Sequence, residues 1–128
     1  MRQARPPKEI PPPLELECLK ALWELGEGNV RMVQQTLEPR RKLAYTTVMT
    51  LLDRLARKGG VARKKVGRAF IYSPLMDRET VRRKAVQELT VTLFDSSPAV
   101  LANYLAKEYV GDKLHAEEGE PQLDASLL

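Results

Sequence analysis

The sequence predicts a mostly α-helical protein with a single β-hairpin. Apolar residues recur at intervals of three and four in five segments, the spacing that places them on one face of a helix. Between the third and fourth of these segments, two short runs of β-forming residues flank Gly67-Arg68, which is the pattern of a hairpin. With 128 residues and 43% hydrophobic content, the chain is long enough for one small domain followed by a helical extension.

Two helices are expected in the first part of the chain. Pro13 suits the first turn of one helix, and Gly26 follows its last apolar residue. Its apolar side consists of Leu14, Cys18, Leu22 and Leu25. Asn29 is expected to cap the second helix, which ends before Pro39. The buried side of this second helix is predicted to be Val30, Val33 and Leu37.

The third helix and the hairpin follow each other directly. The helix has apolar residues at i, i+3, i+4 and i+7, namely Val48, Leu51, Leu52 and Leu55. Gly59 is the expected stop signal, and Arg57-Lys58 suit the negative end of the helix dipole. Two strands, predicted over residues 61–66 and 69–73, then pair across Gly67-Arg68.

Three helices followed by a two-stranded wing, in this order, predict a winged helix-turn-helix over residues 10–75. At about 100° per residue, Thr46 and Thr50 lie opposite the apolar stripe of the third helix, with Thr47 and Arg54 on one flank. Short hydroxyl side chains near a helix start permit close approach to base edges in the major groove of DNA. These residues are therefore candidates for reading DNA sequence.

A simpler interpretation is also available for this helix start. Threonines at the beginning of a helix often only cap it, and Thr47 is the best placed of the three to do so. Tyr45 lies at the mouth of the same helix, where it either stacks on a sugar or covers the turn.

Positive charge is concentrated in the same part of the chain. The net charge is +4, but residues 1–76 hold 15 Lys and Arg against 7 Asp and Glu, whereas residues 77–128 hold 6 against 10. From Arg40 to Arg68 there are ten basic residues and one acid, Asp53. Such a field attracts a polyanion, and double-stranded DNA is the expected partner. The wing cations expected to contact phosphates are Arg63, Lys64, Lys65 and Arg68.

Two further helices are expected in a dimerisation region over residues 76–110. Asp77 can cap the first of them, and Ser97-Pro98 is a start signal for the second. Their apolar stripes are Val81, Ala85, Leu89 and Leu93, and then Leu101, Tyr104 and Leu105. Packing against the same pair of a second chain would bury both stripes in a homodimer, while the alternative is that the pair folds back on its own winged domain. Residues 1–9 and 111–128 are expected to be flexible tails.

Other functions are poorly supported by the composition. One histidine, His115, and one cysteine, Cys18, leave little material for acid–base chemistry or metal binding, so we expect no enzyme, metal or cofactor. The apolar runs are too short for a membrane span or a signal peptide, so we expect a cytoplasmic protein. An aromatic content of 5% disfavours an RNA-binding platform. The main alternative is a winged-helix protein-interaction module of a larger assembly.

The most specific sequence signals are "LELECLKALWELGEGNVRMVQQTLE" and "LAYTTVMTLLDRLARKGGVARKKVGRAFIYSP". They resemble the penicillinase repressor family, the BlaI/MecI/CopY type of winged-helix transcriptional repressors. The resemblance implies a repressor that binds a palindromic operator as a homodimer. It also implies that repression is relieved when an upstream membrane sensor leads to proteolytic cleavage in the dimerisation region. Copper-responsive members carry a C-terminal cluster of paired cysteines, which this sequence lacks.

Overall fold

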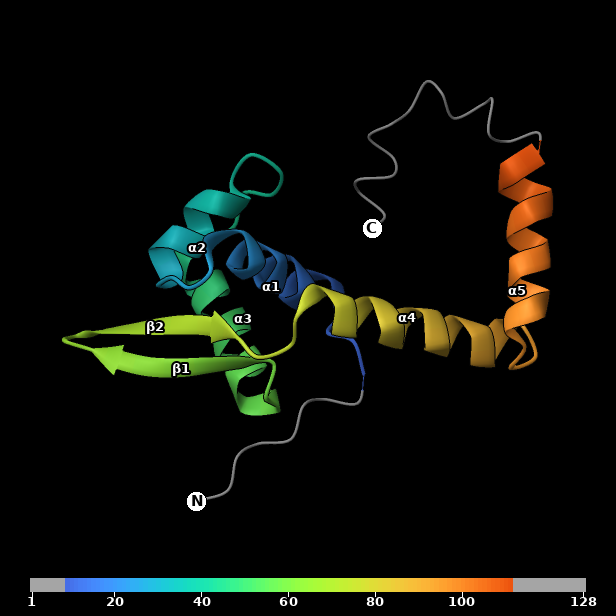
Figure 1. Ribbon diagram of the computed structural model, residues 1–128. Coiled ribbons are helices and arrows are strands. Elements are labelled where there is room, and N and C mark those ends of the chain that lie inside the picture. Colours follow the sequence, from blue (N-terminus) through green and yellow to red (C-terminus); the bar gives the residue numbers. More distant parts are fainter. Residues whose placement is uncertain (1–8, 112–128) are drawn as a thin grey trace, which may run out of the picture. The chain divides into compact units, whose positions relative to one another are not determined.

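A computed structural model describes residues 9–111 of the chain. Its elements are α1 (Pro13–Leu25), α2 (Val30–Leu37), α3 (Tyr45–Lys58), β1 (Val61–Val66), β2 (Ala69–Pro74), α4 (Arg78–Leu93), α5 (Pro98–Leu105) and a π-helical turn, η1 (Ala106–Gly111) (Figure 1). The predicted order of three helices, a hairpin and two helices is confirmed. The tails expected at residues 1–9 and 111–128 fall almost entirely outside the described residues.

The chain divides into two compact units between residues 85 and 86, inside α4. The first unit holds α1 to α3, the hairpin and the first half of α4. Within it, α1, α2 and α3 pack on one another, and the tip of the hairpin points away from them (Figure 1). The second unit holds the rest of α4, α5 and η1. Across residues 9–111, no helix combines the length and the apolar character needed to cross a bilayer.

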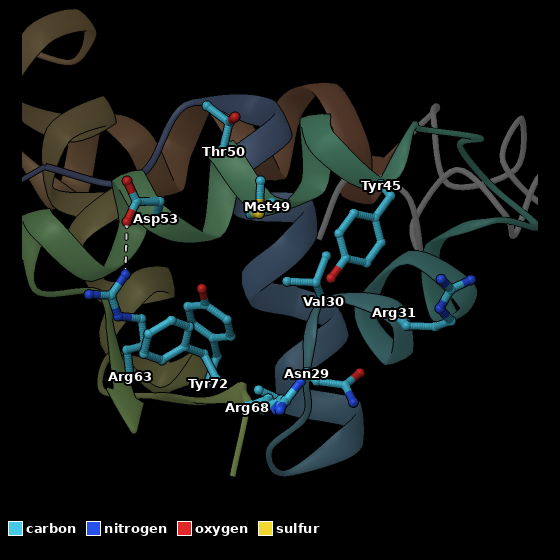
Figure 2. Close-up of a pocket in the computed structure, with 12 residues that line it drawn as sticks. Asn29, Val30, Arg31, Tyr45, Met49, Thr50, Asp53, Arg63, Arg68 and Tyr72 are labelled. Carbon is cyan, nitrogen blue, oxygen red and sulfur yellow. Dashed lines mark hydrogen bonds and ion pairs between the residues drawn. The ribbon is translucent and has the colours of Figure 1, made fainter. Parts of the chain in front are cut away.

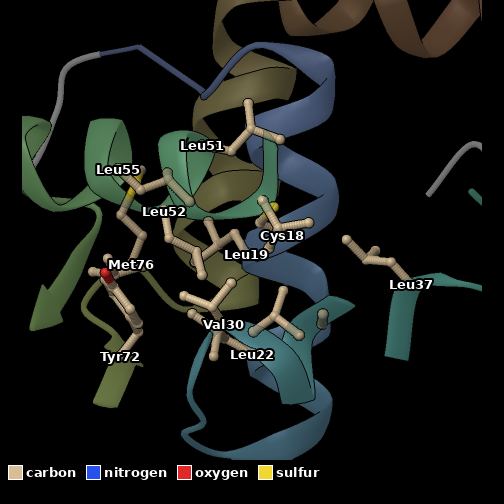
Figure 3. Close-up of a cluster of buried hydrophobic side chains, with 14 of the residues drawn as sticks. Cys18, Leu19, Leu22, Val30, Leu37, Leu51, Leu52, Leu55, Tyr72 and Met76 are labelled. Carbon is tan, nitrogen blue, oxygen red and sulfur yellow. The ribbon is translucent and has the colours of Figure 1, made fainter. Parts of the chain in front are cut away.

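The core of the first unit is formed largely by the stripes that the sequence predicts (Figure 3). On α1, however, Cys18 and Leu22 are buried with Leu19 and Ala21, whereas Leu14 and Leu25 are only partly buried. The four predicted residues of α3 and the three of α2 are all buried. Tyr72 from β2 and Met76 from the following loop complete this core. Cys18 is buried among them, and burial, together with the charges of Glu15 and Glu17, raises the pKa of its thiol to about 12. Cys18 therefore behaves as a small hydrophobic side chain.

Caps and a backbone bridge fix the ends of these elements. The Asn29 side chain accepts a hydrogen bond of 2.9 Å from the Met32 amide, as expected for the cap of α2. Gly59 has a φ of 89°, so α3 ends in the left-handed conformation that glycine adopts without strain. The base of the hairpin is anchored by two backbone hydrogen bonds of 2.8 and 3.0 Å between Gly28 and Tyr72.

One ion pair, between a buried glutamate and a partly exposed lysine, ties α1 to the end of α3. The Glu15 side chain is only 4% exposed, and its carboxylate lies 2.9 Å from the ammonium of Lys58. A buried carboxylate without a partner is unfavourable because it loses its hydration. Lys58 therefore serves as the partner of Glu15, although in the sequence it belongs to the basic segment from Arg40 to Arg68.

Replacing Lys58 by methionine is expected to destabilise the protein by about 1–3 kcal/mol, because the buried side chain of Glu15 would lose its hydrogen-bonding partner. Thermal unfolding measures this loss. A matched control is Lys20→Met, which breaks the longer 4.0 Å pair with Glu17 on the same helix and should change stability by less than about 1 kcal/mol. Equal melting temperatures for Lys58→Met and the wild type would show that the Glu15–Lys58 pair contributes nothing.

The second unit buries very little. Ser97 caps α5 by accepting a hydrogen bond from the Val100 amide. The ring centroids of Phe94 and Tyr104 lie 5.3 Å apart. Among residues 86–109, whose side chains are described, only Thr90 is buried. Large apolar side chains stay exposed, among them Val86, Leu89, Val91, Leu93, Val100, Tyr104, Leu105 and Tyr109.

Candidate DNA-binding surface

The outward face of α3 carries the threonines that the sequence singles out. Thr46 and Thr50 are exposed, whereas Val48 and Leu52 on the opposite side are buried. Thr47 is half-buried on the flank. The helix therefore presents small hydroxyl-bearing side chains near its N-terminus, as its periodicity predicts.

No threonine caps this helix. The N-cap residue is Ala44, and it makes no side-chain capping hydrogen bond. The Thr50 hydroxyl instead donates to the Thr46 carbonyl at 3.0 Å, which leaves its oxygen lone pairs and its methyl group available. Since the first amides of a helix have no partner within it, those at the start of α3 can bind an anion such as a phosphate.

A cleft of about 600 Å³ lies between α3 and the wing (Figure 2). From α3 it is lined by Tyr45, Met49, Thr50 and Asp53, and from the wing by Arg63, Arg68, Ala69, Phe70 and Tyr72. The start of α2 closes the cleft with Asn29, Val30 and Arg31. The guanidinium of Arg31 lies 5.4 Å from the centre of the Tyr45 ring, so this tyrosine is held at the rim of the cleft.

The wing cations differ in their surroundings. Arg63 lies 3.1 Å from the Asp53 carboxylate, and its guanidinium stacks 4.4 Å above the Phe70 ring. Side chains alternate along a strand, so Lys65 shares the face of Arg63 and Lys64 lies on the other face. Arg68 sits in the turn beside Gly67, whose φ of 65° makes the tight connection possible.

Only part of the basic segment is free to bind an anion. Four of its ten cations are paired with carboxylates, namely Arg40, Arg57, Lys58 and Arg63. Within residues 9–111, the remaining six form no ion pair: Arg41, Lys42, Arg54, Lys64, Lys65 and Arg68. Arg54 is exposed on α3, so it can act together with the threonine face.

The residues proposed for dimerisation fall into two groups. Val81 is 6% exposed and belongs to the core of the first unit, and Ala85, one turn further along α4, is half-buried. In the second unit Leu101 is half-buried, and the others are exposed, by 40% for Leu89, 70% for Leu93, 44% for Tyr104 and 43% for Leu105. Within the proposed dimerisation region, the exposed large apolar side chains therefore start after Ala85, at Val86.

The sequence is similar to known proteins of the penicillinase repressor family. The family model described as "Penicillinase repressor" matches residues 12–120. The chain is 45% identical over 67 residues to the transcriptional regulator BlaI of Mycobacterium tuberculosis, covering 52% of this chain and 49% of that protein. It is 35% identical over 63 residues to the penicillinase repressor of Bacillus licheniformis, covering 49% of each. The chain thus spans about half the length of the curated relatives it matches.

The fold is also similar to a solved structure. The solution structure of the DNA-binding domain of the repressor BlaI superimposes with a TM-score of 0.52 and 29% identity, covering 59% of this chain and 93% of that domain. The likeness confirms the winged helix-turn-helix that the order of elements predicts. Since the family model covers most of the sequence, the chain belongs to the penicillinase repressor family.

Proposed function

We propose that the protein is a sequence-specific DNA-binding transcriptional regulator, a repressor that binds a palindromic operator as a homodimer in the cytoplasm. The observation that carries the proposal is the outward face of α3, where Thr46 and Thr50 are exposed beside a wing with unpaired cations. An α-helix fits the major groove, and the N-terminal residues of the recognition helix reach base edges there. The relatives named as transcriptional regulator BlaI and penicillinase repressor support this function.

Recognition divides between the two parts of this surface. Thr46 and Thr50 read bases through their hydroxyl and methyl groups, with Thr47 and Arg54 on the flank and Tyr45 at the rim. The uncapped start of α3 accepts a phosphate. On the wing, Lys64, Lys65 and Arg68 contact phosphates, which supplies affinity and fixes the register without reading sequence. Arg63 contributes to the same field while paired with Asp53.

Dimerisation would explain why the second unit leaves large apolar side chains exposed. The helix α5 buries none of its residues, and Leu89 and Leu93 on α4 are exposed. Packing these faces against a second copy removes apolar surface from water. It would also place two recognition helices about one helical turn apart, the spacing of a palindromic operator.

The family resemblance suggests one route of release from the operator, and release by a bound ligand is the alternative. An upstream membrane sensor and protease system would cleave the dimerisation region, which would separate the two half-site readers. Each would then bind with the much lower affinity of a single module.

The competing proposal is a protein-interaction module. The two proposals differ in salt dependence, because DNA binding by phosphate contacts weakens steeply with salt and binding to a neutral protein surface does not. Fluorescence anisotropy of a labelled duplex at several salt concentrations measures this. Absence of salt-dependent DNA binding at micromolar protein would favour the protein-interaction module.

Removing one wing cation is expected to lower the salt dependence by a defined amount. Each phosphate contact contributes about −0.9 to the slope of log affinity against log salt, so Lys65→Ala or Arg68→Ala should reduce the slope of a dimer by about two. Lys20→Ala on α1 removes the same charge away from the wing and should leave the slope nearly unchanged. A wild-type slope for either wing variant removes that residue from the contact surface.

A further inference from the structure

Asp53 is the one acid between Arg40 and Arg68, and it lines the cleft between α3 and the wing. Both of its carboxylate oxygens are engaged. Oδ1 lies 3.1 Å from Nη1 of Arg63 on the wing, and Oδ2 lies 3.1 Å from Nη2 of Arg57 one turn along α3 (Figure 2 shows the Arg63 pair). One carboxylate therefore binds two of the ten cations of the basic segment.

The pair with Arg63 is fixed from two sides. Its guanidinium stacks 4.4 Å above the Phe70 ring while its Nη1 group donates to Asp53. The two contacts link β1 and β2 to α3 across the cleft. Arg63 is thus already paired in the free protein, and it must leave Asp53, or share it, to bind a phosphate.

A carboxylate at this position acts differently on two kinds of DNA complex. Non-specific binding depends almost entirely on phosphate contacts, and its register can adjust to recruit every free cation. In a specific complex, base contacts by Thr46 and Thr50 fix the position of α3, so a freed arginine adds less. Asp53 also repels nearby phosphates, and this repulsion is the same on any sequence.

We propose that Asp53 is a specificity-determining residue: by holding Arg57 and Arg63 in intramolecular ion pairs on the surface, it weakens non-specific DNA binding more than operator binding. The inference rests on the proposed function. It assigns a role to an acid that a surface built for DNA affinity alone would not contain.

A second role for an acid on a recognition helix is to accept a hydrogen bond from the amino group of cytosine. The geometry favours the first role for two reasons. Both oxygens of Asp53 are occupied by arginines, and Asp53 lies in the third turn of α3, beyond the first residues that reach base edges.

The test compares Asp53→Asn with the wild type on an operator selected by the wild-type protein and on a random duplex. Asparagine keeps the shape and removes the charge. Affinity for the random duplex should rise, and the salt slope should steepen by about 0.9 for each additional phosphate that a freed arginine neutralises. The gain in affinity of Asp53→Asn over the wild type on the random duplex should shrink about threefold per such phosphate when the salt concentration rises from ~50 to ~200 mM. The ratio of specific to non-specific affinity should fall.

Two further variants isolate the mechanism. Glu79→Gln removes the same charge from an i, i+4 pair with Arg83 on α4, and it should leave the ratio unchanged. In an Arg63→Ala background, Asp53→Asn should raise the affinity for random DNA by less than it does alone, because one freed cation is missing. Melting temperatures of all variants verify that they are folded.

Three results would overturn the inference. If the wild type prefers the operator and Asp53→Asn has the same ratio of specific to non-specific affinity, the inference is wrong and the proposed function still stands. If Asp53→Asn loses affinity only for operators with cytosine at one position, Asp53 reads that base instead. A wild-type protein that does not discriminate between duplexes defeats the proposed function itself, and the inference with it.

Discussion

Replacing Leu89 by glutamate is expected to lower the affinity for a two-half-site operator by about 10²–10⁴-fold, the increase that linking two binding modules provides. Leu89 is 40% exposed at the centre of the apolar stripe of the second unit. A charge there would have to be buried in the dimer without a partner, which is strongly unfavourable. The winged domain should remain folded, because Leu89 is not part of its core.

A control variant tests whether the position or the charge matters. Gln87 is exposed on the same helix and lies about 160° away from Leu89 at 100° per residue. Gln87→Glu adds the same charge and should leave operator affinity within a few fold. Analytical ultracentrifugation should show a wild-type dimer and a Leu89→Glu monomer. A monomeric wild-type protein at micromolar concentration would contradict the proposed dimer.

Alanine at Thr46 or Thr50 is expected to weaken binding to the specific operator by about 1–3 kcal/mol per half-site. Both threonines are exposed on the outward face of α3, and neither caps it, because Ala44 is the cap residue. Binding to a random duplex should barely change, since non-specific complexes make few base contacts. Parallel titrations of both duplexes measure the ratio of the two affinities.

The control for stability is Thr92→Ala. The hydroxyl of Thr92 donates to the Glu88 carbonyl at 2.7 Å, the same type of bond that Thr50 makes to Thr46. Both substitutions should therefore change the melting temperature similarly, while only Thr50→Ala should lower operator affinity. If the affinity of Thr46→Ala and Thr50→Ala falls equally on both duplexes, these threonines do not read bases.

Local signals explain why most of the fold could be predicted from the sequence. The stripes of α2 and α3 follow the period of a helix, and buried residues occupy the predicted positions. Asn29, Asp77 and Ser97 cap the helices that they precede, each through an amide three residues on. The register of the hairpin follows from the position of Gly67-Arg68.

Contacts between distant residues could not be predicted in this way. Glu15 and Lys58 are 43 positions apart, and the Trp23 indole donates to the Met76 carbonyl, 53 positions on, at 2.8 Å. Sequence spacing indicates which side of a helix is buried, but it does not indicate which residue lies opposite. Asp53 follows Thr46 by seven residues, a spacing that puts both on the same face of α3, but this spacing does not reveal the pair of Asp53 with Arg63.

The most direct test of the proposed function is selection of binding sites from a pool of random duplexes by the purified wild-type protein. A homodimer with a threonine face on each α3 should enrich an inverted repeat whose half-sites lie about 10–10.5 base pairs apart, or a multiple of that distance. Alanine at Thr50 should reduce the enrichment at one position of each half-site. A pool that shows no enriched motif after selection, although the protein binds the DNA, would contradict sequence-specific recognition.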